Sequence, residues 1–272
     1  MTRPSVGILG AGSIGEIFAH GLLRAGWDPK DLTLAVRRPD RARDLEYTTG
    51  AKATLSLAEA TEGRDVLVVS VKPKDVPAVL GEISDLVTPD QVVVSVAAGV
   101  PVSVFEDALP GIPIVRSMPN TPSAVDLGMA AYSIGETVDD DHAERAEIVL
   151  AAVGDTLRVS EDLLDAVTAV SGTGPAYVFL MAEALIEAAI REGLPHHAAE
   201  RIVHQTVRGA GELLTASDKS AFRLRGEVTS PGGTTAAAMH VLEDGGFRAL
   251  MENAVRAAAE RSRELGEKVS DR

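Results

Sequence analysis

The feature that most constrains the fold is a glycine-rich turn that follows an apolar segment near the start of the chain. The turn reads Gly10-Ala11-Gly12-Ser13-Ile14-Gly15. Gly10 permits a sharp turn, Gly12 lets a pyrophosphate approach the backbone, and Gly15 lets a helix pack closely on a strand. Apolar residues then recur with helical spacing from Ile14 to Leu22. The segment predicts a strand, turn and helix that bind a dinucleotide; a glycine turn without a ligand is the alternative.

Short apolar runs alternate with helical patterns over residues 1–158. Such continuous, β-branched runs are typical of parallel strands that are covered on both faces. The predicted strands are Val6–Leu9, Leu32–Val36, Val66–Val71, Val92–Val96, Ile112–Val115, Met129–Ser133 and Thr156–Val159. The predicted helices lie at 14–25, 39–46, 56–62, 75–83, 101–108 and 141–152. The alternation indicates a doubly wound α/β domain of the Rossmann type.

The strand pattern ends after Glu161, and residues 159–272 are predicted to form an all-helical domain. Helical patterns cover 176–192, 195–214 and 235–265, with a break at Gly245-Gly246. The segment Ala176–Ile190 is apolar on nearly every face, so it must be buried on nearly every face. A helical region of this size can hardly enclose such a helix alone. We therefore expect a homodimer of interlocked helices.

Composition narrows the classes of function and partner. The net charge of −14 argues against nucleic acids and anionic membranes. The absence of cysteine excludes disulfides, thiolate chemistry and cysteine-based zinc sites. The apolar tract Ala176–Ile190 is interrupted by two glutamates and is too short to span a bilayer. Gly10 and Gly12 fall where the apolar part of a signal peptide would lie, so we expect a cytoplasmic protein.

Further candidate cofactor residues follow other predicted strands, because ligands of open α/β sheets bind beyond the carboxyl ends of the strands. These residues are Val71-Lys72-Pro73, Ala97-Ala98-Gly99, and the pair Pro119 and Asn120. Small residues in the second segment let a flat ring lie close to the backbone, and the third presents an amide from a stiffened loop. Together with the glycine turn they predict one continuous cofactor trough. Lys72 is also the best alternative candidate for a general acid.

Arg37 and Arg38 stand just past the second predicted strand. An NAD site places an acidic residue about twenty positions after the glycine turn, where it holds the ribose 2′-hydroxyl. Here two arginines occupy the place where a 2′-phosphate would lie. The sequence therefore favours NADP, with NAD as a weaker possibility and a solvated basic patch as the alternative.

A second anion-binding turn is predicted at Ser230–Thr235, directly before a helical pattern. Pro231 restricts the backbone, Gly232 and Gly233 allow a ligand to approach it, and free N–H groups at a helix start attract a carboxylate or phosphate. The alternative is a tight turn that is merely capped by Thr234 or Thr235. The six histidines form no HExxH pattern, and His196 and His197 point to different sides of a helix, so no metal site is predicted.

These motifs together resemble the pyrroline-5-carboxylate reductases, which reduce a cyclic imine to proline. The resemblance covers essentially the whole chain and depends most on Ser171–Tyr177 and on Thr229–Thr235. It implies an NADP-binding domain, a helical dimerisation domain and assembly as a homodimer or a ring of dimers. An asparagine that is common in the family is replaced by Leu57, which affects one contact on the adenosine side.

The resemblance also implies roles for individual residues. The backbone of Gly232, Gly233 and Thr234, beside Ser230, would hold the carboxylate of a cyclic imine. The catalytic Thr235 would hydrogen-bond the ring nitrogen while NADPH delivers hydride to the imine carbon, carbon five of the proline product, so that the enzyme acts mainly by orientation. A related reductase of hydroxyacids or other imines is the nearest alternative, although Ala176–Ile190 has no lysine for it. A regulatory protein that binds NADPH without turnover is the second alternative.

Overall fold

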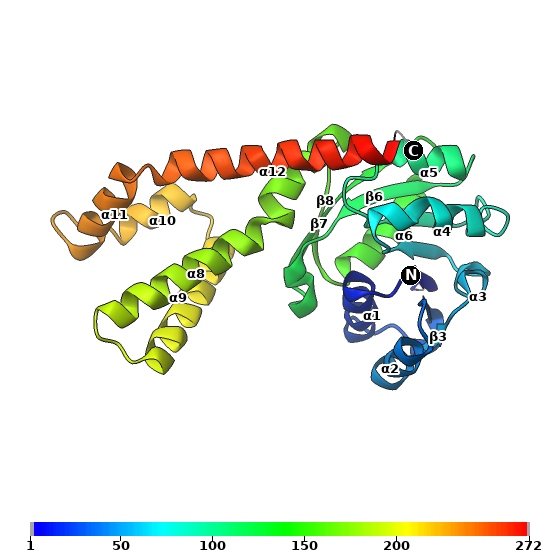
Figure 1. The fold of residues 1–272 in the computed structure, drawn as a ribbon, viewed down its shortest axis with the longest axis horizontal. Coiled ribbons are helices and arrows are strands. Elements are labelled where there is room, and N and C mark those ends of the chain that lie inside the picture. Colours follow the sequence, from blue (N-terminus) through cyan, green and yellow to red (C-terminus); the bar gives the residue numbers. More distant parts are fainter. Residues whose placement is uncertain (1–2, 271–272) are drawn as a thin grey trace. The chain divides into compact units, whose positions relative to one another are not determined.

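The computed structural model describes residues 3–270, which divide into two compact units. The first unit contains the described residues up to Thr173 together with the end of the last helix from Ala257 onward. The second unit runs from Gly174 to Arg256. Figure 1 follows the chain through both units by colour. The expected division of the chain after residue 158 remains a prediction.

The described part of the first unit is centred on a sheet of eight strands (Figure 1). Their spatial order is β3-β2-β1-β4-β5-β6-β7-β8. β1 to β6 are parallel, β7 is antiparallel to β6, and β8 is parallel to β7. The strands are β1 (Val6–Leu9), β2 (Leu32–Ala35), β3 (Lys52–Thr54), β4 (Val66–Val69), β5 (Val92–Ser95), β6 (Ile114–Met118), β7 (Gly128–Ile134) and β8 (Gly154–Arg158). The order reverses between β1 and β4, which confirms the predicted doubly wound fold.

Helices cover both faces of this sheet because side chains alternate along each strand. In β4, Val66 and Val68 join one apolar cluster, which includes Phe18 of α1, while Leu67 and Val69 join another. The second cluster is completed by side chains of α3, α4 and α5. The helices are α1 (Ser13–Arg24), α2 (Pro39–Thr49), α3 (Leu57–Thr61), α4 (Val76–Ile83), α5 (Val102–Ala108), α6 (Asp140–Ala151) and α7 (Leu164–Val167). Every residue of β1, β2, β4 and β5 is buried, as predicted for strands covered on both faces, whereas the edge strand β8 is largely exposed.

The second unit consists of helices alone. They are α8 (Gly174–Arg191), α9 (His196–Ala216), α10 (Ala221–Glu227), α11 (Thr234–Asp244) and the first part of α12 (Phe247–Ser270). No residue of α8 is buried within the single chain, and the side chains of Phe179 and Leu180 are both 66% exposed. A monomer therefore leaves the apolar helix uncovered, in agreement with the expectation that a second copy covers it.

The structure differs from the sequence predictions in three respects. The short edge strand β3 and the helices α7 and α10 were not predicted. The predicted strand Ile112–Val115 is displaced, since β6 spans Ile114–Met118. The argument from length against a membrane span was wrong: the helical run Glu161–Arg191 is long and apolar enough to cross a membrane by length and composition alone. The apolar tract is therefore shorter than the helix that contains it.

Candidate active site

The predicted cofactor segments follow four parallel strands that are neighbours in the sheet. Leu9 of β1 pairs with Val69 of β4, Val69 pairs with Ser95 of β5, and Ser95 pairs with Arg116 of β6. The carboxyl ends of these strands consequently lie along one edge, and the chain segments that leave them start side by side. The structure thus brings together the four segments that the sequence singled out.

The glycine turn has the geometry that each of its glycines was expected to serve. Gly10 has φ +91°, and a Cβ there would lie 2.3 Å from Cγ1 of Val71. A Cβ on Gly15 would lie 2.6 Å from Oγ of Ser70, whereas one on Gly12 would meet nothing closer than 3.9 Å. Turn and helix therefore require two of the glycines for packing, and Gly12 leaves the backbone open to a ligand.

The start of α1 offers free backbone donors beside this turn. Gly12 is the N-cap residue and provides no side-chain cap, and the N–H of Glu16 is the first to bond back to Gly12, at 2.9 Å. Among the hydrogen bonds of the described residues, none uses the N–H groups of Ser13, Ile14 or Gly15. Such donors and the positive end of the helix dipole fit a pyrophosphate.

The segment after β4 supports the turn and adds a cation. Ser70 donates a hydrogen bond from its hydroxyl to the carbonyl oxygen of Gly10, at 3.0 Å. Sequence reasoning missed Ser70; the available signal was a polar residue at the end of an apolar strand. The side chain of Lys72 is exposed, and it forms no ion pair within the described residues. Its ammonium group is therefore free to meet an anion.

The segment after β5 has only small residues at positions 97–99. Ala97 and Gly99 are buried, while Ala98 between them is exposed. Gly99 has φ +74°, in the left-handed region that favours glycine. A methyl group is thus the largest side chain that this loop offers, which suits close contact with a planar ring.

The loop after β6 carries Pro119 and Asn120. Pro119 is buried, and Asn120 is partly buried. The side-chain amide of Asn120 donates to Ser171 and its carbonyl oxygen accepts a hydrogen bond from the N–H of Met129. The amide that was expected to face the cofactor trough is therefore bonded within the protein.

Arg37 and Arg38 follow β2, which is the neighbour of β1 on the other side from β4. Their side chains are 79% and 72% exposed, and they pair with Asp75 at 3.1 Å and Asp40 at 2.7 Å. Desolvation acts to raise the pKa of Asp40, but the hydrogen bond and charge of Arg38 outweigh it and hold that pKa below its usual value. Exposed ion pairs contribute little stability, so both guanidinium groups can exchange partners for a phosphate.

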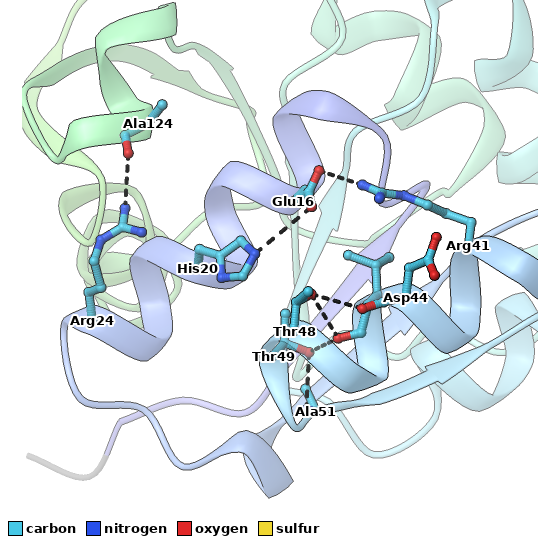
Figure 2. A network of polar contacts seen from close by, with 10 residues as sticks. Glu16, His20, Arg24, Arg41, Asp44, Thr48, Thr49, Ala51 and Ala124 are labelled. Carbon is cyan, nitrogen blue, oxygen red and sulfur yellow. Dashed lines mark hydrogen bonds and ion pairs between the residues drawn. The ribbon is translucent and has the colours of Figure 1, made fainter.

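A further arginine neutralises an acidic side chain near the start of α1. Figure 2 shows Arg41 of α2 in an ion pair with Glu16, whose carboxylate also lies 3.9 Å from His20. Glu16 lies in the first turn of α1, where an uncompensated carboxylate would repel an anionic ligand. Arg41 is not among the predicted site residues, and its position adds a charge-balancing contact to the site.

In the second unit, Ser230–Gly233 form a β-turn that leads into α11. The N–H of Gly233 donates to the carbonyl oxygen of Ser230 at 3.0 Å, with Pro231 second and Gly232 third at φ +69°. This arrangement is the type II turn, in which the third position needs a positive φ. A Cβ on Gly233 would lie 2.4 Å from Oγ of Ser230, so a larger residue at the fourth position would require the Ser230 hydroxyl to move.

The alternative reading of this turn as a threonine-capped helix start is wrong. The N-cap residue is Gly233, Thr234 is the first residue of α11, and no side chain caps the helix. The first N–H of α11 that bonds back is that of Ala237, at 3.2 Å from the carbonyl oxygen of Gly233. Among the hydrogen bonds of the described residues, the N–H groups and hydroxyls of Thr234 and Thr235 take no part. This helix start therefore has unused donors for an anion and a hydroxyl beside them.

The remaining residues that the sequence singled out are the histidines, as possible metal ligands, and Leu57. Within the described residues, no three His, Asp or Glu side chains gather in a way that could hold a metal ion. His196 lies 3.5 Å from Glu200 on the exposed surface of α9. Leu57 begins α3 and packs against the second apolar cluster, so it offers no polar contact to an adenosine.

Comparisons with known proteins agree with these features. A family model described as pyrroline-5-carboxylate reductase dimerisation matches residues 161–265, and one described as NADP oxidoreductase, coenzyme F420-dependent, matches residues 5–99. A pyrroline-5-carboxylate reductase of Mycobacterium tuberculosis is 43% identical, with 96% of each chain covered. One of Arabidopsis thaliana is 37% identical and covers 96% of this chain and 95% of its own.

Two solved structures show the same fold over nearly the whole chain. A pyrroline-5-carboxylate reductase of Coxiella burnetii has a TM-score of 0.92 at 38% identity, covering 97% of this chain and 99% of its own. A pyrroline carboxylate reductase of Plasmodium falciparum with NADP bound has a TM-score of 0.87 at 29% identity, covering 98% and 99%. With relatives this similar along almost its full length, the chain belongs to the pyrroline-5-carboxylate reductase family.

Proposed function

We propose that this protein reduces L-1-pyrroline-5-carboxylate to L-proline, with NADPH as the hydride source, in the last step of proline biosynthesis. The observation that carries the proposal is the helix start at Thr234. Its type II turn and unused N–H groups suit a small carboxylate, and nothing in a general dinucleotide fold calls for them. The residues at the carboxyl edge of the sheet, here called the cofactor edge, would bind NADPH, the hydride source.

NADP fits the residues at this edge. The free N–H groups of α1 and the open Gly12 suit its pyrophosphate, and Arg37 and Arg38 suit its 2′-phosphate. The segments Val71–Pro73, Ala97–Gly99 and Pro119–Asn120 would line the remainder of the cofactor. When bound, NADPH supplies the hydride; the residues of the chain supply charge, shape and position.

The substrate carboxylate is assigned to the turn before α11. Gly232 leaves the turn open, because a Cβ there would meet nothing within 4 Å. Gly233 uses its own N–H inside the turn, so the donors left for a carboxylate are those of Gly232, Thr234 and Thr235. The hydroxyl of Thr235 would then reach the ring nitrogen. These contacts fix the imine at two points, which is what an orientation mechanism needs.

The chemistry needs little acid–base machinery. A cyclic imine is readily protonated, and the iminium accepts hydride at its C=N carbon, which becomes carbon five of proline. The site residues accordingly comprise backbone donors, a hydroxyl and Lys72, without a paired His and Asp. Lys72 remains the alternative proton donor, since its ammonium group is exposed at the cofactor edge.

Assembly and location are part of the proposal. We assign 1–158 to cofactor binding and 159–272 to dimerisation and substrate binding. The uncovered face of α8 supports a homodimer or a ring of such dimers. The net charge of −14 supports a protein without nucleic-acid or anionic-membrane partners, and we place it in the cytoplasm.

The test is NADPH oxidation on addition of pyrroline-5-carboxylate, with the product identified as proline by mass spectrometry. Hydroxyacid and 2-keto acid pairs serve as rival substrates, and binding of NADPH alone is measured by its fluorescence. Turnover only with a rival substrate would indicate a related reductase. Tight NADPH binding without any turnover would indicate a regulatory protein.

A further inference from the structure

Asn120 has every hydrogen-bonding group of its side chain bonded to another part of the first unit. Its Nδ2 donates to the carbonyl oxygen of Ser171 at 3.2 Å and to the Ser171 Oγ at 3.1 Å. Its Oδ1 accepts from the N–H of Met129 in β7 at 3.0 Å. An amide has one carbonyl oxygen and two N–H donors, and all of them are used. The side chain therefore serves the fold of the site and has no donor left for a ligand.

The partner segment has an unusual backbone. Thr168–Gly172 form a π-helical turn between α7 and α8, and the N–H of Thr173 bonds to the carbonyl oxygen of Thr168 at 2.9 Å. Such turns are rare and occur frequently at functional sites. The last two residues of the turn, Ser171 and Gly172, begin Ser171–Tyr177, one of the two motifs on which the family resemblance depends most.

The backbone of the π-helical turn also lies close to the side chain of Met118. A Cβ on Gly172 would lie 2.7 Å from Cε of Met118, the last residue of β6. Glycine at this position thus lets the π-helical turn approach the end of the strand. The contact with Met118 and the Asn120 bonds join the end of β6 and the loop after it to the turn before α8 at two positions, 118 and 120.

We propose that Asn120 is a positioning residue that, through Ser171, fixes the loop after β6 so that cofactor and imine meet in the geometry for hydride transfer. The inference depends on the proposed function. It assigns the Asn120 side chain a different task from direct cofactor binding. Reaction rates are sensitive to such placement, because a shift of about 1 Å can cost about a hundredfold.

The chain offers a matched control for this amide. Gln91 also uses its whole side-chain amide: Nε2 donates to the carbonyl oxygens of Thr61 at 2.9 Å and Arg64 at 2.6 Å. Its Oε1 accepts from the N–H of Thr88 at 2.9 Å. Gln91 precedes β5 and so lies at the opposite edge of the sheet from the cofactor segments. Gln91→Ala removes the same number of bonds without touching the proposed site.

The experiment compares Asn120→Ala with Gln91→Ala in the full-length protein. We expect both to lower the melting temperature, because each leaves buried backbone groups unpaired. Only Asn120→Ala should lower kcat/KM for the imine, by tenfold or more, and raise the deuterium isotope effect with NADPH labelled at the transferred position. The dissociation constant of NADPH should change less than threefold. Exchange of the Met129 amide hydrogen should become faster.

A graded variant protects the test if Asn120→Ala does not fold. Ser171→Ala removes the bond to Oγ and keeps the one to the carbonyl oxygen, so kcat/KM should fall about two- to fivefold. In the double variant Asn120→Ala/Ser171→Ala, kcat/KM should be almost the same as in Asn120→Ala alone, because both changes act on one contact.

Several outcomes would overturn the proposal. The first is that Asn120→Ala and Gln91→Ala have equal kcat/KM values and equal isotope effects. Another is NADPH binding weakened tenfold or more with normal kcat, which would make Asn120 a cofactor ligand. If the wild type does not reduce the imine, the proposed function fails, while amide exchange at Met129 still shows whether the Asn120 contact exists.

Discussion

Gly266, near the end of α12, lies directly against Gly99 in the loop after β5. A Cβ on Gly266 would be 2.8 Å from the carbonyl oxygen of Gly99, and one on Gly99 would be 3.4 Å from the nitrogen of Gly266. The neighbouring Ser262 is buried and donates to Oδ1 of Asp165 at 2.5 Å. The last helix of the chain therefore supports a loop that is assigned to the cofactor.

Replacement of Gly266 by Ala should destabilise the protein although alanine favours helices. The added methyl group must displace the backbone of Gly99, and overpacking of this kind typically costs about 1–3 kcal/mol. Gly81 in α4 is the control, because a Cβ there meets nothing within 4 Å and Gly81→Ala should stabilise by about 0.5–1 kcal/mol. Urea unfolding measures the free energy of unfolding of both variants. Equal stability of the two variants would show that α12 does not support this loop.

Replacement of Arg37 and Arg38 by Ala should reverse the preference for NADPH. Each guanidinium can form charge-assisted hydrogen bonds to a 2′-phosphate, typically about 1.5–3 kcal/mol, or roughly ten- to a hundredfold in affinity. NADH has no such phosphate and should be affected much less. Arg145→Ala, whose side chain pairs with Asp141 at 2.8 Å on α6, is the control. An unchanged ratio of kcat/KM for the two cofactors would remove both arginines from the site.

Thr235→Ala should reduce catalysis while the fold persists. Thr235 provides no helix cap, so little stability is at stake. Loss of a hydrogen bond to a charged nitrogen typically costs about 1.5–3 kcal/mol, or roughly ten- to a hundredfold in kcat/KM. Thr48→Ala, whose hydroxyl donates to the carbonyl oxygen of Asp44 at 2.9 Å (Figure 2), controls for loss of a helical threonine. Normal kcat/KM in the Thr235 variant would exclude the proposed contact.

Leu180→Asp should disrupt the oligomer and the folding of the helical unit together. The side chain is 66% exposed in one chain and is expected to be buried by the partner, where an unpaired carboxylate is strongly unfavourable. Tyr47→Asp, at a side chain that is 91% exposed on α2, should leave the assembly intact. Analytical ultracentrifugation measures the assembly of each variant, and circular dichroism measures its folding. A folded, fully assembled Leu180 variant would place the interface elsewhere.

Most of the sheet could be predicted because its signals are local. The strands β4 and β5 are continuous valine-rich runs, and burial on both faces imposes that pattern over a few residues. The edge strand β3 has only three residues and includes the exposed Lys52, so it has no such pattern. Short helices such as α10, with no buried residue in one chain, are equally hard to detect.

The task of a polar loop residue could not be predicted in this way. Asn120 follows β6, but its amide bonds to Ser171, which is 51 residues away along the chain. Nothing in the loop sequence distinguishes an amide that faces a ligand from one that faces a neighbouring segment. The same holds for the contact of Gly266 with Gly99, which depends on the last helix returning to the first unit.

The most direct test of the central claim follows the transferred hydrogen. The protein is incubated with pyrroline-5-carboxylate and NADPH that carries deuterium at the transferred position, and the product is analysed by mass spectrometry and NMR. We predict L-proline with one deuterium at carbon five, since the site residues are proposed to hold the carboxylate and nitrogen while that carbon accepts hydride. Proline without deuterium, label at another carbon, or no proline at all would contradict the account.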